Sequence, residues 1–384
     1  MCDAMRARTI VFVSNDPVYL FRFRGPLIEA FRRRGYSVYA TAPAHDGVYE
    51  ARIEALGATF IPWPLNKTSQ NPLAELASIT ALYRIIKPLN ADIVFAYTVK
   101  PVIYGLIAAW LAGVPRRVGM ITGLGYAFVE GKGVARKLLR QAVMRAYAAA
   151  FSVASEVIFQ NEDDIAQLRA AGLLKPTTPV SRVNGSGVDM DHYSTDAWPD
   201  GAPRFLMMAR LLWDKGVGEF IAAARIVRRE FPDAHFTLVG EGDSNPAAVS
   251  PDQVQAWVDE GLIEAPGRLA DPRPAFADAH IFVLPSYYME GCPRVNLEAL
   301  SMARPIITTD WVGCRETVVD GLNGRLIPVR DTQALAQAMR EMARDLPRAR
   351  AMGQAGRDLC RQRFELSAVT RATVDLIEGP SCRD

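Results

Sequence analysis

A chain of 384 residues is long enough for two α/β domains, because single hydrophobic cores rarely grow beyond about 250–300 residues. Hydrophobic residues make up 49% of the chain and charged residues 22%, which is ordinary for a folded protein and argues against intrinsic disorder. The net charge of +2, with no DNA- or RNA-binding motif beside it, argues against a nucleic-acid partner.

The cysteines indicate reduced thiols and neither a disulfide framework nor a metal site. Their number is odd and no C-x-x-C pair occurs among Cys2, Cys292, Cys314, Cys360 and Cys382. Met1–Arg8 has no apolar region of the secretory type, and the apolar run Val102–Val114 is shorter than the roughly 20 residues that span a bilayer. We therefore expect a cytoplasmic protein, no metal or other cofactor, and a buried helix over Val102–Val114.

Short apolar runs alternate with helical patterns along the whole chain, which predicts β-α-β units around parallel sheets. Most runs are apolar from end to end, as expected for strands that are covered on both faces. In the first half the predicted strands are Thr9–Ser14, Ser37–Ala42, Ala58–Pro62, Asp92–Tyr97, Arg117–Ile121, Glu156–Gln160 and Val180–Asn184. In the second half they are Arg204–Ala209, His235–Gly240, Gly267–Leu269, His280–Leu284, Ile306–Thr308 and Gly324–Ile327.

The stretch Gly133–Arg145 interleaves basic and apolar residues at helical spacing. Such a helix, with Arg136, Lys137, Arg140 and Arg145 on it, can lie on an anionic membrane surface. It can equally pack its apolar stripe on the first domain, and the pattern leaves both readings open.

The domain boundary is expected at Asn184–Asp189, where asparagine and glycine permit unusual backbone angles, and a polar stretch follows to about Ala202. This predicts a first Rossmann-like domain over residues 1–187 and a second over residues 188–384. The last helix, expected at about Leu346–Ile377, is placed back against the first domain.

Two cations follow the first strand of the second domain. Phe205–Gly216 is a strand that runs into a loop and then a helix, and Arg210 and Lys215 lie in the loop. Two positive charges at the carboxyl end of a strand can hold a diphosphate and stabilise it as it leaves, without a metal ion. Taken alone, each is more often an ordinary surface residue. Gly240 and Gly242 come at the end of the next strand. They could help to bind an anion, or they could form a tight turn with no role in binding.

The most informative segment, Ser286–Leu300, leaves the carboxyl end of the strand at His280–Leu284. Gly291 lets the backbone approach a ligand, and Pro293 suits the first turn of a helix, whose free N–H groups would face an anion. Residues Gly291, Cys292, Pro293 and Arg294 are therefore expected to line a diphosphate site. Glu290 and Glu298 would face different parts of one ligand, for which a vicinal diol is a natural target. The competing reading is a loop glutamate and a solvated helix glutamate.

A further segment, Thr308–Gly324, contains a helix start led by Gly313 whose N–H groups could add to the same anion site.

Taken in order, these segments resemble the second domain of retaining glycosyltransferases of family four, which have the GT-B fold of two Rossmann-like domains facing across a cleft. The resemblance covers nearly the whole chain. It implies that Arg210 and Lys215 bind the diphosphate, that Glu290 lies by the donor sugar and that Glu298 binds the ribose hydroxyls. Ala209 and Ala303 stand where many members have glycine, and we expect both to be tolerated.

The first half resembles bacterial members of this family that extend undecaprenyl-diphosphate-linked sugars. The resemblance rests on Phe12–Ile28, Tyr97–Gly105 and Ile121–Tyr126. It implies an acceptor site whose loop, Ser14 to Gly25, contributes Ser14, Asn15, Arg22, Arg24 and Gly25. Arg22 and Arg24 would meet an acceptor diphosphate, and Lys100, Thr122 and Gly123 would border the cleft.

The expected activity is therefore retaining transfer of a hexose or N-acetylhexosamine from a UDP-sugar to a lipid-linked sugar, at the cytoplasmic face of the inner membrane. UDP, the acceptor class and retention are implied by the resemblance alone. Two alternatives stay open, namely a sugar-nucleotide 2-epimerase of the same fold and a nucleotide-binding module that has lost catalysis.

Overall fold

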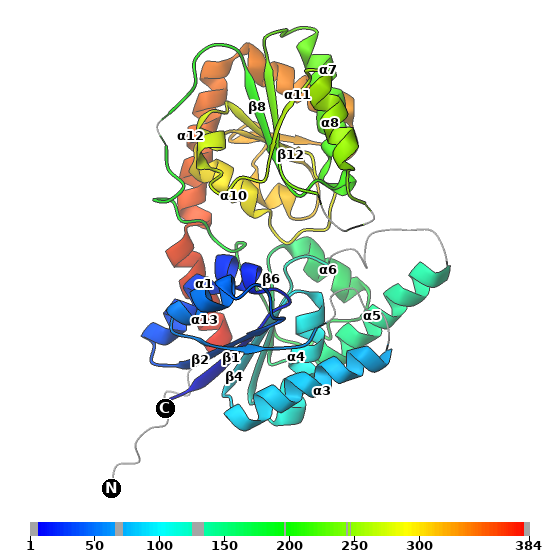
Figure 1. Ribbon diagram of the computed structural model, residues 1–384, viewed down its shortest axis with the longest axis vertical. Helices are drawn as coiled ribbons and strands as arrows, with labels where there is room; N and C mark the ends of the chain where they lie inside the picture. The colour runs from blue at the N-terminus through cyan, green and yellow to red at the C-terminus, as the bar shows by residue number, and fades with distance from the viewer. Residues whose placement is uncertain are drawn as a thin grey trace. The chain divides into compact units, whose positions relative to one another are not determined.

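The computed structural model describes residues 7–65, 72–124, 134–195, 197–242, 245 and 247–379. These residues form two compact units (Figure 1). The first contains Met1–Ser186 together with Ala368–Asp384, and the second contains Gly187–Ser367.

The first unit is built on a parallel sheet of seven strands in the order β3-β2-β1-β4-β5-β6-β7. The strands are β1 (Thr9–Val13), β2 (Ser37–Ala42), β3 (Thr59–Pro62), β4 (Ile93–Tyr97), β5 (Arg116–Met120), β6 (Glu156–Phe159) and β7 (Val180–Arg182). The helices that connect them are α1 (Pro17–Arg33), α2 (Val48–Ala55), α3 (Pro72–Leu89), α4 (Val99–Ala112), α5 (Val134–Ser152) and α6 (Glu162–Ala170).

The central strands are apolar throughout because helices cover both faces of the sheet. Every residue of β1 and β4 is buried. Alternate residues such as Phe12 and Phe95 pack under α1, where Leu27, Ile28 and Phe31 are buried in the same cluster. The apolar run expected to be a buried helix is α4, most of which is buried. In the described part of the chain, no helix combines the length and apolar character needed to cross a membrane.

The second unit has a parallel sheet of six strands in the order β10-β9-β8-β11-β12-β13. The strands are β8 (Arg204–Met208), β9 (His235–Val239), β10 (Glu264–Gly267), β11 (Ile281–Leu284), β12 (Ile306–Thr309) and β13 (Gly324–Ile327). Its α-helices are α7 (Val217–Arg228), α8 (Pro251–Asp259), α9 (Arg273–Ala277), α10 (Arg294–Ser301), α11 (Thr332–Arg344) and α12 (Leu346–Arg363), and two 3-10 helices are η2 (Trp213–Lys215) and η3 (Cys314–Thr317).

Two doubly wound parallel sheets confirm the predicted fold class, and each predicted strand is present. One of them is displaced: β10 is Glu264–Gly267, whereas the sequence pattern indicated Gly267–Leu269. The reason is that β10 lies at the edge of its sheet, where a proline is tolerated because one side makes no ladder hydrogen bonds. Pro266 and Glu264 therefore fit this strand although they gave no apolar signal.

Each sheet reverses its strand order between two neighbouring strands that are far apart in sequence. In the first unit this happens between β1 and β4, and in the second between β8 and β11. Loops diverge from the carboxyl ends of strands at such a point, and α/β proteins bind ligands in the crevice that results. The segments that the sequence singled out, after β1, β4, β8 and β11, all begin at these two edges.

The single C-terminal helix expected over Leu346–Ile377 is two helices, α12 and α13 (Leu366–Glu378). The chain breaks between them at Phe364, which is buried in the core of the second unit, and its carbonyl accepts a hydrogen bond from the Val188 N–H (2.8 Å). From Ala368 onward the chain belongs to the first unit, and Val374 and Ile377 are part of that unit's core.

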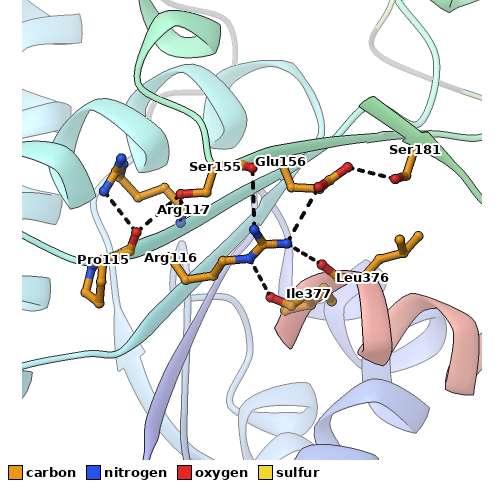
Figure 2. A network of polar contacts seen from close by, with 8 residues as sticks. All are labelled: Pro115, Arg116, Arg117, Ser155, Glu156, Ser181, Leu376 and Ile377. Carbon is orange, nitrogen blue, oxygen red and sulfur yellow. Dashed lines mark hydrogen bonds and ion pairs between the residues drawn. The ribbon is translucent and has the colours of Figure 1, made fainter. Parts of the chain in front are cut away.

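A partly buried arginine, Arg116, holds the end of α13 against the first sheet (Figure 2). Arg116 donates to the carbonyl oxygens of Leu376 (2.6 Å) and Ile377 (3.1 Å), and it lies 3.7 Å from the carboxylate of Glu156. The last carbonyl groups of a helix have no partner within the helix, so an arginine aimed at them satisfies acceptors that would otherwise be buried unpaired. Arg116 thus anchors α13 to the first unit.

Candidate functional site

The cation loop of the second unit has the predicted form of strand, loop and helix. β8 ends at Met208, Arg210 is exposed, and Lys215 ends η2 with only 8% of its surface exposed. Gly216 follows with φ +81°, and a Cβ placed on it would lie 2.2 Å from the carbonyl oxygen of Pro285. A glycine is therefore needed at this position, because it brings the backbone beside Lys215 against the end of β11.

That approach joins the predicted catalytic cation to a predicted catalytic carboxylate. The Lys215 Nζ lies 2.5 Å from the Glu290 Oε1, and the two side chains are 10% and 17% exposed. The Ser286 hydroxyl donates to the same carboxylate oxygen over 3.2 Å. Residues 75 positions apart in sequence thus form one mostly buried ion pair at the carboxyl edge of the sheet.

An aromatic ring, which the sequence analysis did not include, lies under both cations. The Arg210 guanidinium carbon is 5.5 Å from the centre of the Tyr288 ring, and the Lys215 ammonium is 5.0 Å from it. Cations within about 6 Å of a ring face are attracted by its electron density. Tyr288 therefore contacts both predicted cations. The available signal was its place two residues before Glu290.

The helix that carries the second carboxylate begins one residue later than expected. α10 starts at Arg294, and Pro293 is its N-cap with an extended backbone (ψ 112°), not a residue of the first turn. Glu298 is neither solvated nor loosely held, because its Oε1 lies 3.1 Å from the Arg294 Nε and only 12% of its side chain is exposed. Each of the two glutamates of the predicted site is thus bound to a cation.

The segment Thr308–Gly324 packs against the loop that carries Glu290 and contains a short helix. Gly313 has φ +75°, and a Cβ there would lie 2.5 Å from the Glu290 carbonyl oxygen. It is the N-cap of η3, a 3-10 helix of four residues, so the predicted helix start is present, and its part in an anion site stays a prediction. Cys292 and Cys314 are beside it, and burial raises the pKa of Cys314 to about 11, so this thiol is protonated and unreactive at neutral pH.

The glycines after β9 differ from each other in role. Gly240 has φ +157°, and a Cβ on it would lie 2.0 Å from the carbonyl oxygen of Ala209. It packs the end of β9 against the end of β8, which favours the tight-turn reading. A Cβ on Gly242 would meet no atom within 4 Å. Gly242 is therefore the one of the two with open space around its Cα.

In the first unit the expected loop from Ser14 to Gly25 is mostly helix. The Asp16 side chain accepts from the Val18 N–H (2.9 Å) as an N-cap, and α1 begins at Pro17. Ser14 and Asn15 do lie at the carboxyl edge, and the buried Ser14 hydroxyl accepts from the Tyr97 hydroxyl at the end of β4 (2.7 Å). Only these two of the predicted acceptor residues in this segment follow the strand directly.

Arg22 and Arg24 do not form a pair. Arg22 is exposed and donates to the Tyr49 hydroxyl (3.2 Å), whereas Arg24 is 3% exposed and stacks over the Tyr97 ring at 4.9 Å. Residues two apart on a helix point about 200° away from each other, so the two guanidinium groups face opposite sides of α1. The expectation that both meet one acceptor diphosphate is wrong for this reason, and Gly25, also in α1, is buried.

Lys100 lies in the first turn of α4 and is paired with a carboxylate from α3. Its Nζ is 2.9 Å from the Glu75 Oε1, and the Tyr104 hydroxyl donates to the other oxygen of Glu75. Thr122 and Gly123 follow β5 at the same edge and are half-buried. Gly125 and Tyr126 lie outside the described residues.

The predicted membrane helix is α5. The side chains of residues 134–139, including Arg136 and Lys137, are not among those described. Further along, Arg140 and Arg145 are exposed while Tyr147 and Phe151 are buried. α5 thus packs one face on the first unit and exposes basic residues on another.

Within the described ranges, no group of three or more histidine, cysteine, aspartate or glutamate side chains is arranged to hold a metal ion. The buried histidine directly before β11, His280, is held by the backbone: its Nδ1 accepts from the Arg204 N–H (3.0 Å) and its Nε2 lies 2.7 Å from the Pro199 carbonyl oxygen.

Comparison with known proteins covers both units. Residues 202–345 match the family described as Glycosyl transferases group 1, and residues 9–161 match the family described as Glycosyl transferase 4-like. The cation loop and both carboxylates lie within the first of these matches, and the segments after β1, β4 and β5 lie within the second.

Similar proteins act in bacterial glycan assembly. The N,N'-diacetylbacillosaminyl-diphospho-undecaprenol alpha-1,3-N-acetylgalactosaminyltransferase of Campylobacter jejuni is 28% identical over 349 residues, which cover 88% of this chain and 89% of that protein. The capsular polysaccharide biosynthesis glycosyltransferase CapM of Staphylococcus aureus is 22% identical over 348 residues and 88% of each chain. Among solved structures, Anabaena HepE in complex with UDP superposes with a TM-score of 0.76 at 18% identity over 97% of this chain and 99% of that one.

Proposed function

This chain is a glycosyltransferase of the group 1 and 4-like families with the GT-B fold, and from that premise we propose that it transfers a sugar from a UDP-sugar to a lipid-diphosphate-linked sugar with retention of configuration. The transferred group would be a hexose or an N-acetylhexosamine. The observation that carries the proposal is the convergence of Lys215, Glu290 and Arg210 at the carboxyl edge of one sheet.

In the proposed reaction the bond between the anomeric carbon and the diphosphate oxygen breaks, and negative charge grows on the leaving UDP. Arg210 and Lys215 stabilise that charge, and a cation fixed before the reaction contributes more than one that must reorganise. The acceptor hydroxyl bonds to the anomeric carbon from the face that UDP leaves, and a diphosphate oxygen takes its proton. No metal ion is needed in this scheme.

The two glutamates would position the donor. Glu290, held by Lys215 and Ser286, would lie by the transferred sugar. Glu298, held by Arg294, would accept hydrogen bonds from the ribose hydroxyls. The backbone from Gly291 to Arg294 would approach the diphosphate. UDP as the nucleotide is supported by the solved structure of HepE with UDP.

The acceptor class is supported by the name of the Campylobacter relative, which acts on a diphospho-undecaprenol-linked sugar. Ser14, Asn15, Lys100, Thr122 and Gly123 at the edge of the first sheet would bind the acceptor. Such a lipid would bring the protein to the cytoplasmic face of the inner membrane, with the helix from Arg136 to Arg145 against anionic headgroups. Sedimentation with anionic liposomes tests this contact, and charge reversal at Arg136, Lys137 and Arg140 should reduce it.

A panel of UDP-sugars offered with lipid-diphosphate-linked acceptors, followed by mass spectrometry, tests the activity. We expect one donor to give a product heavier by one sugar residue, and NMR of that product to show the anomeric configuration of the donor. Formation of an epimerised sugar from the donor alone would instead establish a 2-epimerase. Binding of UDP without transfer to any acceptor would establish a nucleotide-binding module, and either result would contradict the proposal.

A further inference from the structure

The backbone has an unusual conformation at the carboxyl end of β4, where the strand order of the first sheet reverses. Thr98 follows β4 directly and has φ +70° and ψ 165°. This region of backbone angles is essentially restricted to glycine, because a side chain clashes with the backbone there. Such strain persists only where the surrounding structure enforces it, and it is concentrated at active sites and ligand-binding sites.

The usual role of a threonine at this position does not explain the strain. Thr98 is the N-cap of α4, where a threonine hydroxyl normally accepts a hydrogen bond from an N–H group of the first turn. Within the described chain, the Thr98 side chain makes no such capping bond, and its Oγ1 is buried without a hydrogen-bond partner. A glycine would adopt the same angles without strain, so neither capping nor backbone geometry accounts for a threonine here.

A second polar side chain of the same kind follows the neighbouring strand. β1 and β4 pair in parallel register up to their carboxyl ends, and the Tyr97 hydroxyl donates to the Ser14 hydroxyl over 2.7 Å. The next residues along the two strands are Asn15 and Thr98, so the continued register places them side by side. The Asn15 Oδ1 is also buried and has no hydrogen-bond partner among the described residues.

The two oxygen atoms indicate what kind of group they would bind. A carboxamide oxygen only accepts hydrogen bonds, whereas a hydroxyl both donates and accepts. A sugar hydroxyl therefore suits both Asn15 and Thr98, whereas the diphosphate of a lipid carrier offers only acceptor oxygens. Asp16, the next residue along, adds a carboxylate that also disfavours a phosphate. Asn15 and Thr98 each keep part of their surface exposed, so a change of rotamer can present their oxygens to a ligand.

We propose that Asn15 and Thr98 bind a hydroxyl group of the acceptor sugar and thereby help to determine which sugar the protein extends. This deepens the proposed function and rests on it, because it takes the first unit as the acceptor-binding unit. It adds Thr98 to the acceptor site, and it assigns the pair to the sugar and not to the lipid diphosphate. The strained backbone keeps the Thr98 hydroxyl from capping α4 and leaves it for the acceptor.

Transfer kinetics of Thr98→Val test the proposal, with the lipid-diphosphate-linked sugar that gives a product in the panel as the acceptor. Valine keeps the shape of threonine and removes the hydroxyl. The acceptor KM should rise at least about threefold, the loss expected for one hydrogen bond between neutral groups. The donor KM and the melting temperature should not change, because the hydroxyl has no partner among the described residues. Thr98→Ser, which restores the hydroxyl, should recover most of the acceptor affinity.

The same lipid diphosphate without its sugar, used as a competitive inhibitor, separates the two parts of the acceptor. Its inhibition constant should be equal in Thr98→Val and the unmodified protein. A rise in this constant that matches the rise in acceptor KM would overturn the assignment to the sugar. Thr59→Val is the matched control, because Thr59 is exposed at the amino end of β3, and it should leave every constant unchanged.

The outcomes distinguish this role from the proposed function. Normal transfer with an unchanged acceptor KM in Thr98→Val overturns the role of Thr98 and leaves the proposed function intact. Absence of transfer by the unmodified protein to any lipid-linked acceptor overturns the proposed function, and the role of Thr98 with it. Thr98→Gly should keep or raise the melting temperature and still raise the acceptor KM. A lower melting temperature with an unchanged KM would show a purely structural threonine.

Discussion

Replacing Lys215 with methionine should separate its part in stability from its part in catalysis. Lys215→Met keeps the length of the side chain and removes the charge, which leaves Glu290 without the cation 2.5 Å away. Breaking a fully buried pair costs about 3–5 kcal/mol, and because these side chains keep 10% and 17% exposure we expect about 2–3 kcal/mol of unfolding free energy. In transfer we expect kcat/KM to fall by roughly 10²–10³, the scale of one electrostatic donor lost from the transition state.

The double variant Lys215→Met/Glu290→Gln provides the decisive comparison. With neither charge present, no unpaired carboxylate is buried, so most of the lost stability should return. Transfer should not return, since the diphosphate would still lack its cation. Arg225→Met is the control: the Arg225–Glu260 pair is similarly short at 2.6 Å but 44% and 45% exposed, so its loss should have little effect on stability and leave turnover unchanged.

Urea unfolding and initial transfer rates measure the two effects on the same preparations. Recovery of turnover in the double variant would show that Lys215 acts only by neutralising Glu290, and the leaving-group role would be refuted. Normal turnover in Lys215→Met would refute it as well.

Three further predictions concern the fold. Gly216→Ala should lower the urea midpoint far more than the control Gly261→Ala. Both glycines have positive φ, but only at Gly216 would a Cβ meet a backbone oxygen. Equal midpoints in the two variants would contradict this reasoning. Arg116→Met should cost about 2–4 kcal/mol of unfolding free energy, with faster hydrogen exchange in α13, whereas Arg33→Met should stay within about 0.5 kcal/mol. Burial raises the pKa of Asp164 to about 7, so ionisation destabilises the folded state progressively as the pH rises from its unfolded pKa through 7. Asp164→Asn should therefore raise the melting temperature more at pH 8 than at pH 5, and a difference independent of pH would rule this out.

The strands were predictable because burial on both faces leaves a continuous apolar run, as in β1 and β4. The same rule explains the displaced strand, since β10 at the sheet edge has only part of its surface covered and accepts Pro266. Parallel topology then places the ends of β8 and β11 side by side, which is why Lys215 and Glu290 could be assigned to one site from the sequence. The direct ion pair between Lys215 and Glu290 could not be predicted, because it depends on the close approach of the backbone at Gly216.

The loop from Ser14 to Gly25 was implied by the resemblance, whereas the local sequence contains two opposing signals. Asp16-Pro17 is an N-cap followed by proline at the first helical position, which predicts a helix start at that point. Gly25-Pro26 opposes a continuous helix, since a proline inside a helix lacks the N–H for one hydrogen bond. The structure keeps both, with Pro26 inside α1. The capping signal was the stronger, because it satisfies a free backbone group directly.

Tyr288 marks a part of the site that no local pattern indicates. It acts through contacts made after folding, with Arg210 and Lys215. It has no charge and no characteristic spacing, so only tertiary structure places it. The consequence is that Arg210, Lys215 and Glu290 are each in contact with a residue from another segment. A ligand that binds there exchanges existing partners for its own phosphate and hydroxyl groups, and its affinity should depend on how firmly those partners are positioned.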